Sequence, residues 1–158
     1  MIAAEELWSE EEPPTWPQGP HPKRVLVAED DAAMRDLLLL VLRERGYAVD
    51  CVSSGSQMIS VLSERHADGS LAVPFDLIVT DVRMPGASGL DAIDQLRRAG
   101  GMTPVIAVTA FPHDSTRNRA ERLEIRLLAK PFDLDTLRAA VAAALDSGPE
   151  PGNPEHQP

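Results

Sequence analysis

The chain has 158 residues, 25 Asp and Glu against 15 Lys and Arg, a formal net charge of −10, and a single cysteine. The length predicts one domain, the lone Cys51 excludes an internal disulfide, and no apolar run approaches the roughly 18 residues that span a membrane. The acidic N-terminus lacks the apolar stretch of a signal peptide, so we expect a cytoplasmic protein. The excess of acids argues against nucleic acid as a partner, because nucleic-acid binding depends on clustered Lys and Arg.

The two ends of the chain differ from the middle in composition. Residues 1–22 hold five Glu and residues 148–158 hold two, with no Lys or Arg in either segment, and nine of the 14 prolines lie there. Segments this acidic and Pro-rich bury little apolar surface, so both are predicted to be disordered tails. Residues 23–147 are then the folded domain. The 11 residues after it are too few for a DNA-binding module, so we expect a stand-alone domain.

Short apolar runs alternate with helical patterns along residues 23–147. The runs are rich in Val, Leu, Ile and Ala and are typical of strands buried on both faces: 25–28, 48–52, 77–80, 105–108 and 127–129. Helical spacing of apolar residues follows each run, at 32–45, 54–65, 89–99, 134–145 and, more weakly, in the polar stretch 114–123. This alternation predicts an α/β fold, a doubly wound five-stranded parallel sheet with five helices. Cys51 lies in the second run and is interpreted as a small core residue.

Polar side chains stand where four of the predicted strands end: Glu29 and Asp30, Asp81, Thr109, and Lys130. Because the carboxyl ends of parallel strands share one edge of the sheet, we expect these side chains to meet. Converging carboxylates repel one another and need a cation, and hard oxygen ligands favour Mg²⁺. Carboxylates, a metal, a hydroxyl and an ammonium group together predict a phosphoryl-transfer site in which an Asp serves as nucleophile.

At these residues the chain resembles the receiver domain of two-component response regulators. The resemblance covers the whole predicted core in four segments, VLVAEDDAAMR (25–35), LIVTDVRMPGASGLD (77–91), VIAVTA (105–110) and AKPF (129–132). The second segment is the most diagnostic, because its apolar strand ends in Asp81 ahead of Met84-Pro85-Gly86. The resemblance implies a flavodoxin-like sheet with strand order 2-1-3-4-5.

The resemblance also implies what the acidic residues do. Asp81 looks like the acceptor of a phosphoryl group that comes from a histidine kinase or a histidine phosphotransfer protein. Asp30 and Asp81 look like direct Mg²⁺ ligands, and Glu29 would act through a water. The backbone carbonyl of Arg83 would complete the protein ligands. The signal would then pass by contact with another, unidentified protein.

The remaining site residues are expected to bind the transferred group. Thr109 would hydrogen-bond a phosphoryl oxygen through its hydroxyl, and Ala110 would do so through its backbone N–H. Lys130 would pair with the phosphoryl oxygens, and the Lys130-Pro131 peptide is expected to be cis.

Three features depart from the family pattern. Leu127 stands three residues before Lys130, where many receivers have Tyr or Phe, so the usual aromatic part of the switch is missing. Residues 113–124 lack the family's Ala-Gly-Ala pattern and are rich in Arg, which indicates either an unusual partner surface or a solvated helix. Arg83, two residues after the acceptor, either holds the phosphoryl oxygens or rests on Glu29.

Two other functions compete with this interpretation. A phosphohydrolase of the haloacid dehalogenase type also uses an aspartyl nucleophile after a strand. That family needs a second Asp two residues later, where this chain has Arg83. A phosphorylation-independent adaptor would keep the fold without the switch. Leu127 favours the adaptor, whereas the intact acidic pair, Asp81, Thr109 and Lys130 oppose it.

Overall fold

The computed structural model describes residues 21–146, so the predicted tails lie almost entirely outside the described residues. Its strands are β1 (Arg24–Ala28), β2 (Ala48–Val52), β3 (Leu77–Asp81), β4 (Val105–Thr109) and β5 (Ile125–Ala129). They form one sheet in the order β2-β1-β3-β4-β5, and every neighbouring pair is parallel. The predicted fold and strand order are therefore confirmed.

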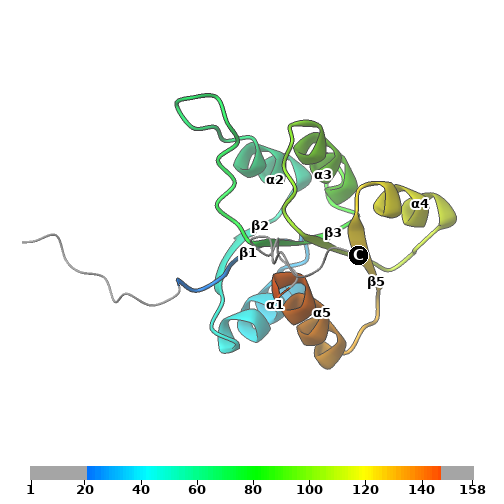
Figure 1. The fold of residues 1–158 in the computed structure, drawn as a ribbon. Helices are drawn as coiled ribbons and strands as arrows, with labels where there is room; N and C mark the ends of the chain where they lie inside the picture. The colour runs from blue at the N-terminus through cyan, green and yellow to red at the C-terminus, as the bar shows by residue number, and fades with distance from the viewer. Residues whose placement is uncertain (1–20, 147–158) are drawn as a thin grey trace, which may run out of the picture.

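Each strand is followed by a helix. The helices are α1 (Ala32–Glu44), α2 (Gly55–Leu62), α3 (Gly89–Arg98), α4 (Asp114–Arg122) and α5 (Leu134–Asp146). Figure 1 shows α2, α3 and α4 on one side of the sheet and α1 and α5 on the other. Before α5, the Asp133 side chain accepts a hydrogen bond from the backbone N–H of Thr136 at 2.6 Å, as expected of an N-terminal cap. No helix within residues 21–146 is long and apolar enough to cross a membrane.

Two elements differ from the predicted ranges by more than one residue at one end. Helix α2 ends at Leu62, three residues before the predicted end, because the chain then folds back in a turn. In that turn Arg65 and Leu71 form an isolated antiparallel bridge, and Gly69 adopts a positive φ of 86°. Strand β5 begins at Ile125, two residues before the predicted run. The prediction began too late because the charged Arg126 interrupts the apolar pattern of the strand.

The expectation of strands buried on both faces is right for the centre of the sheet and wrong for its edges. All five residues of β3 and of β4 are buried, whereas in β2 only Val49 is. Strands β2 and β5 have a neighbour on one side only, so the helices cover them incompletely. Cys51 is exposed on β2, and its interpretation as a core residue is therefore wrong.

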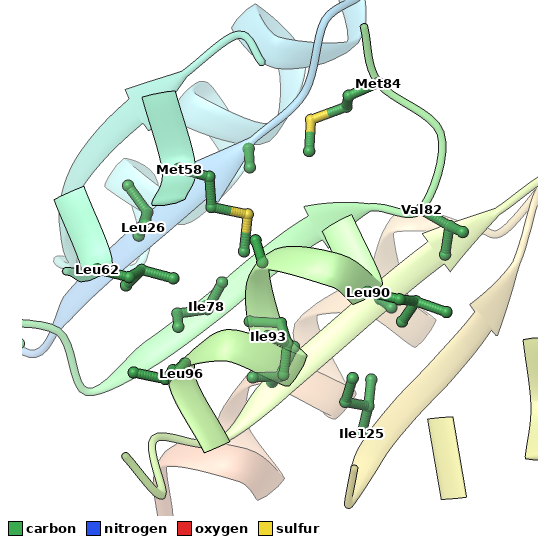
Figure 2. Close-up of a cluster of buried hydrophobic side chains, with 14 of the residues drawn as sticks. Leu26, Met58, Leu62, Ile78, Val82, Met84, Leu90, Ile93, Leu96 and Ile125 are labelled. Carbon is green, nitrogen blue, oxygen red and sulfur yellow. The ribbon is translucent and has the colours of Figure 1, made fainter. Parts of the chain in front are cut away.

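Two apolar clusters hold the helices against the sheet. The first includes Met58 of α2 and Ile93 of α3, which pack over Leu26 and Ile78 of the central strands (Figure 2). The second joins α1 and α5 to the opposite face, with Leu137 fully buried. Burying a Leu, Ile or Met side chain contributes about 1.5–3 kcal/mol. This two-sided core fixes the parallel strands side by side, so their carboxyl ends form a rigid platform.

Candidate phosphoacceptor site

The predicted acidic residues meet at the carboxyl edge of the sheet. Glu29 and Asp30 directly follow β1, and Asp81 is the last residue of β3. One carboxylate oxygen from each lies within 4.8 Å of the others. Glu29 is 1% exposed and Asp81 is 8% exposed, whereas Asp30 is exposed to solvent. The pairing of β1 with β3 therefore brings together acids that are about 50 residues apart in the chain.

Lys130, directly after β5, lies against these carboxylates. Its Nζ donates a hydrogen bond to Asp81 Oδ2 at 2.8 Å and lies 3.5 Å from Glu29 Oε2. Burial lowers the pKa of Lys130, but the hydrogen bond to Asp81 and the attraction of both carboxylates outweigh it, so the pKa is raised. One ammonium against three carboxylates gives a formal charge of 1 − 3 = −2. The site as it stands carries excess negative charge.

Glu29 has one bonded and one unbonded carboxylate oxygen. Oε1 accepts a hydrogen bond from the backbone N–H of Asp31 at 3.2 Å. Oε2 has no hydrogen bond within the described part of the chain, and its contact with the Lys130 ammonium is an ion pair at 3.5 Å. Burial raises the pKa of Glu29 to about 7, with a further increase from Asp81 and a decrease from Lys130. A buried oxygen without a hydrogen bond is costly, and this one fits a cation that takes oxygen ligands.

The backbone after Asp81 turns back toward its own side chain. The Arg83 N–H donates to Asp81 Oδ1 at 3.0 Å. Within residues 21–146 the Arg83 side chain forms no ion pair, and its guanidinium carbon lies 5.3 Å from the centre of the Phe111 ring. Two placements were predicted for this side chain, and the one in which it contacts Glu29 is not observed. Besides Lys130, a second basic side chain contacts Glu29: Arg35 donates a hydrogen bond to the Glu29 backbone carbonyl at 3.1 Å.

Thr109 ends β4 next to the acids. The register pairs Asp81 with Val108, so Thr109 is one residue further toward the open edge. Its side chain is 1% exposed, and its Oγ1 accepts a hydrogen bond from the Phe111 N–H at 3.2 Å. No acceptor among residues 21–146 takes the hydroxyl proton, which leaves Thr109 able to donate to an anion. The following Ala110 is exposed, and the Lys130-Pro131 peptide is cis as expected.

Gly89 is a site residue whose purpose the sequence reasoning missed. It is the first residue of α3, capped by Ser88, and its N–H donates to the Val82 carbonyl at 3.0 Å. A Cβ atom here would overlap the backbone carbonyl oxygen of Asp81 and lie 2.6 Å from Thr80 Oγ1. Only glycine lets the helix approach the acceptor so closely. The signal was present in the sequence, as a glycine directly after a capping serine in the most diagnostic segment.

An apolar groove of about 320 Å³ lies beside Lys130. Its walls come from the start of α1, the end of β4 and the segment between β5 and α5, and are formed by Met34, Leu37, Ala110, Pro131, Phe132 and Leu134. Leu37 is 38% exposed within it. No sequence pattern predicted this groove, because its lining comes from three segments that only the fold brings together.

The Arg-rich segment, residues 113–124, is held to the neighbouring helix α3 by ion pairs of one of its arginines. Arg119 of α4 forms an ion pair with Asp91 of α3 at 2.7 Å and lies 3.7 Å from Asp94. Helix α4 itself buries only Ala120. Leu127, at the departure from the family pattern, is half-buried on β5 and packs against the first core cluster.

Residues 25–142 match the family model of the response regulator receiver domain. The chain belongs to this family. It is 36% identical over 126 residues to the alkaline phosphatase synthesis transcriptional regulatory protein SphR of Synechococcus elongatus, a match that covers 77% of this chain and 48% of that protein. It is 37% identical over 123 residues to the response regulator protein PmrA of Pseudomonas aeruginosa, covering 76% and 51%. The chain thus spans about half the length of these curated relatives.

A solved structure agrees with this assignment. The response regulator protein TrrA of Thermotoga maritima, in complex with Mg(2+)-BeF, aligns with a TM-score of 0.65 and 28% identity. The alignment covers 78% of this chain and 99% of that one. The receiver resemblance expected from the four segments is therefore confirmed, and the domain is a signalling module rather than a conventional enzyme.

Proposed function

We propose that Asp81 accepts a phosphoryl group from the phosphohistidine of a histidine kinase or a histidine phosphotransfer protein. The observation that carries this proposal is the position of the Asp81 carboxylate. It is 8% exposed and accepts a hydrogen bond from the Lys130 ammonium at 2.8 Å, and that ammonium also lies 3.5 Å from the unbonded Glu29 oxygen. An anion that arrives here meets a fixed positive charge and a free hydroxyl donor, which is the arrangement that phosphoryl transfer needs.

Mg²⁺ is the cofactor that fits the site. The formal charge of −2, the oxygen-only donors and the unbonded Glu29 oxygen support this choice. Asp30 and Asp81 would bind the ion directly, together with the backbone carbonyl of Arg83, and Glu29 would bind through a water. When bound, the ion offsets the negative charge that gathers on the phosphoryl oxygens.

The transfer is a substitution at phosphorus. An Asp81 oxygen forms the new P–O bond, while the P–N bond to the donor imidazole breaks and its electron pair stays on nitrogen. Lys130 moves from the carboxylate to the phosphoryl oxygens, to which Thr109 donates its hydroxyl proton and Ala110 its backbone N–H. In self-dephosphorylation a water attacks the same phosphorus, which releases inorganic phosphate and restores the Asp81 carboxylate.

The apolar groove beside Lys130 is the surface that suits the phosphodonor protein. It opens next to the acceptor, and a donor histidine must come within bonding distance of Asp81 in order to react. An apolar partner surface seated on Leu37 and Pro131 would hold the two proteins in that geometry. The output, by contact with a further protein, and the cytoplasmic location expected from the sequence stay predictions.

Labelling the full chain with acetyl phosphate and Mg²⁺ tests the proposal. We expect an acid-stable, hydroxylamine-labile phosphoryl group on the wild-type protein and none in EDTA. Asp81→Asn should abolish the label. Asp36→Asn, which removes an exposed carboxylate of α1, is the matched control and should label normally. An unlabelled wild-type protein would favour the adaptor function, and a labelled Asp81→Asn variant would refute the assignment of Asp81.

A further inference from the structure

A hollow of about 240 Å³ lies between α3 and α4, away from the acidic site. It is lined by Asp94, Arg98, Arg119, Arg122 and Leu123, and we call it the arginine hollow. Its residues belong to the C-terminal parts of the two helices. Because each helix runs back against its strand, this hollow lies near the edge of the sheet where the strands begin, opposite the acceptor.

The arginine hollow has positive charge left over. Arg98 pairs with Asp94 at 3.1 Å, and Arg119 pairs with Asp91 at 2.7 Å. Within residues 21–146, the Arg122 side chain has no hydrogen-bond or ion-pair partner, and the residue is exposed. The lining of the hollow has three arginines and one aspartate, a balance of 3 − 1 = +2, and Asp91, which pairs with Arg119 from outside the lining, reduces it to +1 in a chain whose net charge is −10.

An exposed apolar side chain belongs to the loop that is joined to the turn after α4. Arg97 donates to the backbone carbonyls of Leu123 at 2.9 Å, Gly101 at 3.1 Å and Thr103 at 2.8 Å. These bonds place the loop before β4 against the turn after α4. Met102 lies in that loop and is 65% exposed. The surface therefore combines unpaired positive charge with uncovered apolar area.

The N-terminal segment has the complementary composition. Residues 1–20 contain five Glu and no Lys or Arg, and Leu7-Trp8 lies between Glu5-Glu6 and Glu10-Glu11-Glu12. The segment joins the domain just before Arg24, where β1 begins, at the same edge of the sheet as the hollow. Strand β4 is two strand spacings from β1, about 10 Å, and the chain between residues 12 and 21 spans up to about 30 Å when extended. The segment is long enough to reach.

We propose that residues 5–12 of the same chain dock on the arginine hollow. The glutamates pair with Arg122 and with the outer faces of Arg98 and Arg119, while Leu7 and Trp8 cover Met102 and Leu123. Helix α4 buries only Ala120 and has no side-chain cap at its N-terminus, so docking adds a strap that ties α4 to α3. The acidic surroundings of the apolar groove beside Lys130 make that groove a poorer site for the same segment. This inference does not depend on phosphorylation of Asp81.

Tryptophan fluorescence tests the docking directly, because both tryptophans lie in residues 1–20. In the full chain carrying Trp16→Phe, Trp8 is the single reporter. We expect its steady-state anisotropy to be high in about 20 mM salt and to fall in about 0.5 M salt, as screening weakens the ion pairs. Arg122→Glu should lower the low-salt anisotropy to the high-salt value. Combining it with Glu10→Arg, Glu11→Arg and Glu12→Arg should restore the docked value.

Arg45→Glu is the matched control, since it reverses an exposed charge after α1, on the other side of the sheet. It should leave the anisotropy of Trp8 unchanged. Three results would each overturn the proposal: no loss in Arg122→Glu, an equal loss in Arg45→Glu, or an anisotropy that rises with protein concentration. The first two mean that the arginine hollow does not hold the segment, and the third means that a second molecule does.

Discussion

Replacing Glu29 with Gln should stabilise the metal-free protein at alkaline pH. The Glu29 side chain is 1% exposed, its Oε2 has no hydrogen bond, and two other carboxylates lie within 4.8 Å. Gln keeps the shape of the side chain and the oxygen that accepts the hydrogen bond from the Asp31 N–H. It also removes one negative charge from a cluster of three carboxylates. Its new N–H group can also donate to Asp81.

The size of the effect follows from the pKa of Glu29. Folding raises this pKa from 4.5 to about 7, so the folded protein keeps a proton that the unfolded chain releases between these pH values. The unfolding free energy therefore falls as pH rises from 4.5 to 7, by about 1.4 kcal/mol per pH unit. The total loss at pH 8 is roughly 3 kcal/mol, and the Gln variant avoids it.

Urea unfolding in EDTA at pH 4.5 and pH 8 measures this difference. The gain of Glu29→Gln over wild type should be near zero at pH 4.5 and approach about 3 kcal/mol at pH 8. Asp30→Asn, at the exposed acid next in sequence, should gain well under about 1 kcal/mol. Added Mg²⁺ should stabilise wild type more than Glu29→Gln, since binding adds to folding stability. A Gln variant that is less stable at pH 8, or a gain that is the same at both pH values, would refute the reasoning.

Three further predictions follow from contacts around the site. Gly89→Ala should lower the unfolding free energy by about 1–3 kcal/mol and slow phosphoryl labelling, because its Cβ overlaps the Asp81 carbonyl; normal stability together with normal labelling would contradict this. Arg97→Ala should lower the unfolding free energy in urea by about 2–4 kcal/mol, because three carbonyls lose their donor. Arg97→Lys should recover only part of that free energy, since an ammonium group lacks the planar array of donors of a guanidinium group. Full recovery in Arg97→Lys would contradict the role of the guanidinium geometry. The hydrogen bond from the Arg119 guanidinium lowers the pKa of Asp91. Asp91→Asn should therefore lower the unfolding free energy by under about 1 kcal/mol at pH 7, and should not change it at a pH below the lowered pKa, where the wild-type protein has lost the ion pair. Equal losses of unfolding free energy at both pH values would exclude this ion pair as the cause.

The site could be predicted from the sequence because a parallel sheet aligns strand ends. Glu29 and Asp81 are distant in the chain, but each directly follows an apolar run, so their meeting needed only the fold class. The exposure of β2 and β5 could not be predicted from the sequence in the same way. Periodicity describes one strand at a time, and Cys51 is exposed because its strand ends the sheet.

Contacts between loops could not be predicted from the sequence either. The Arg83 side chain turns toward Phe111 rather than Glu29, and that choice depends on where the segment after β4 lies. Gly89 was visible as part of a motif, but the atoms that exclude a larger side chain belong to Asp81 and Thr80. Such positions are set by packing between segments, which no local pattern encodes.

The exposure of Cys51 has a practical consequence. It is the one cysteine in the sequence, and it lies on an edge strand, so a thiol-reactive dye or spin label attaches at a single defined position without prior mutagenesis. The label sits on β2, at the far side of the sheet from α4 and the arginine hollow, and so leaves both free. The same thiol can link two molecules through an intermolecular disulfide when the purified protein oxidises, so a reductant belongs in every storage buffer.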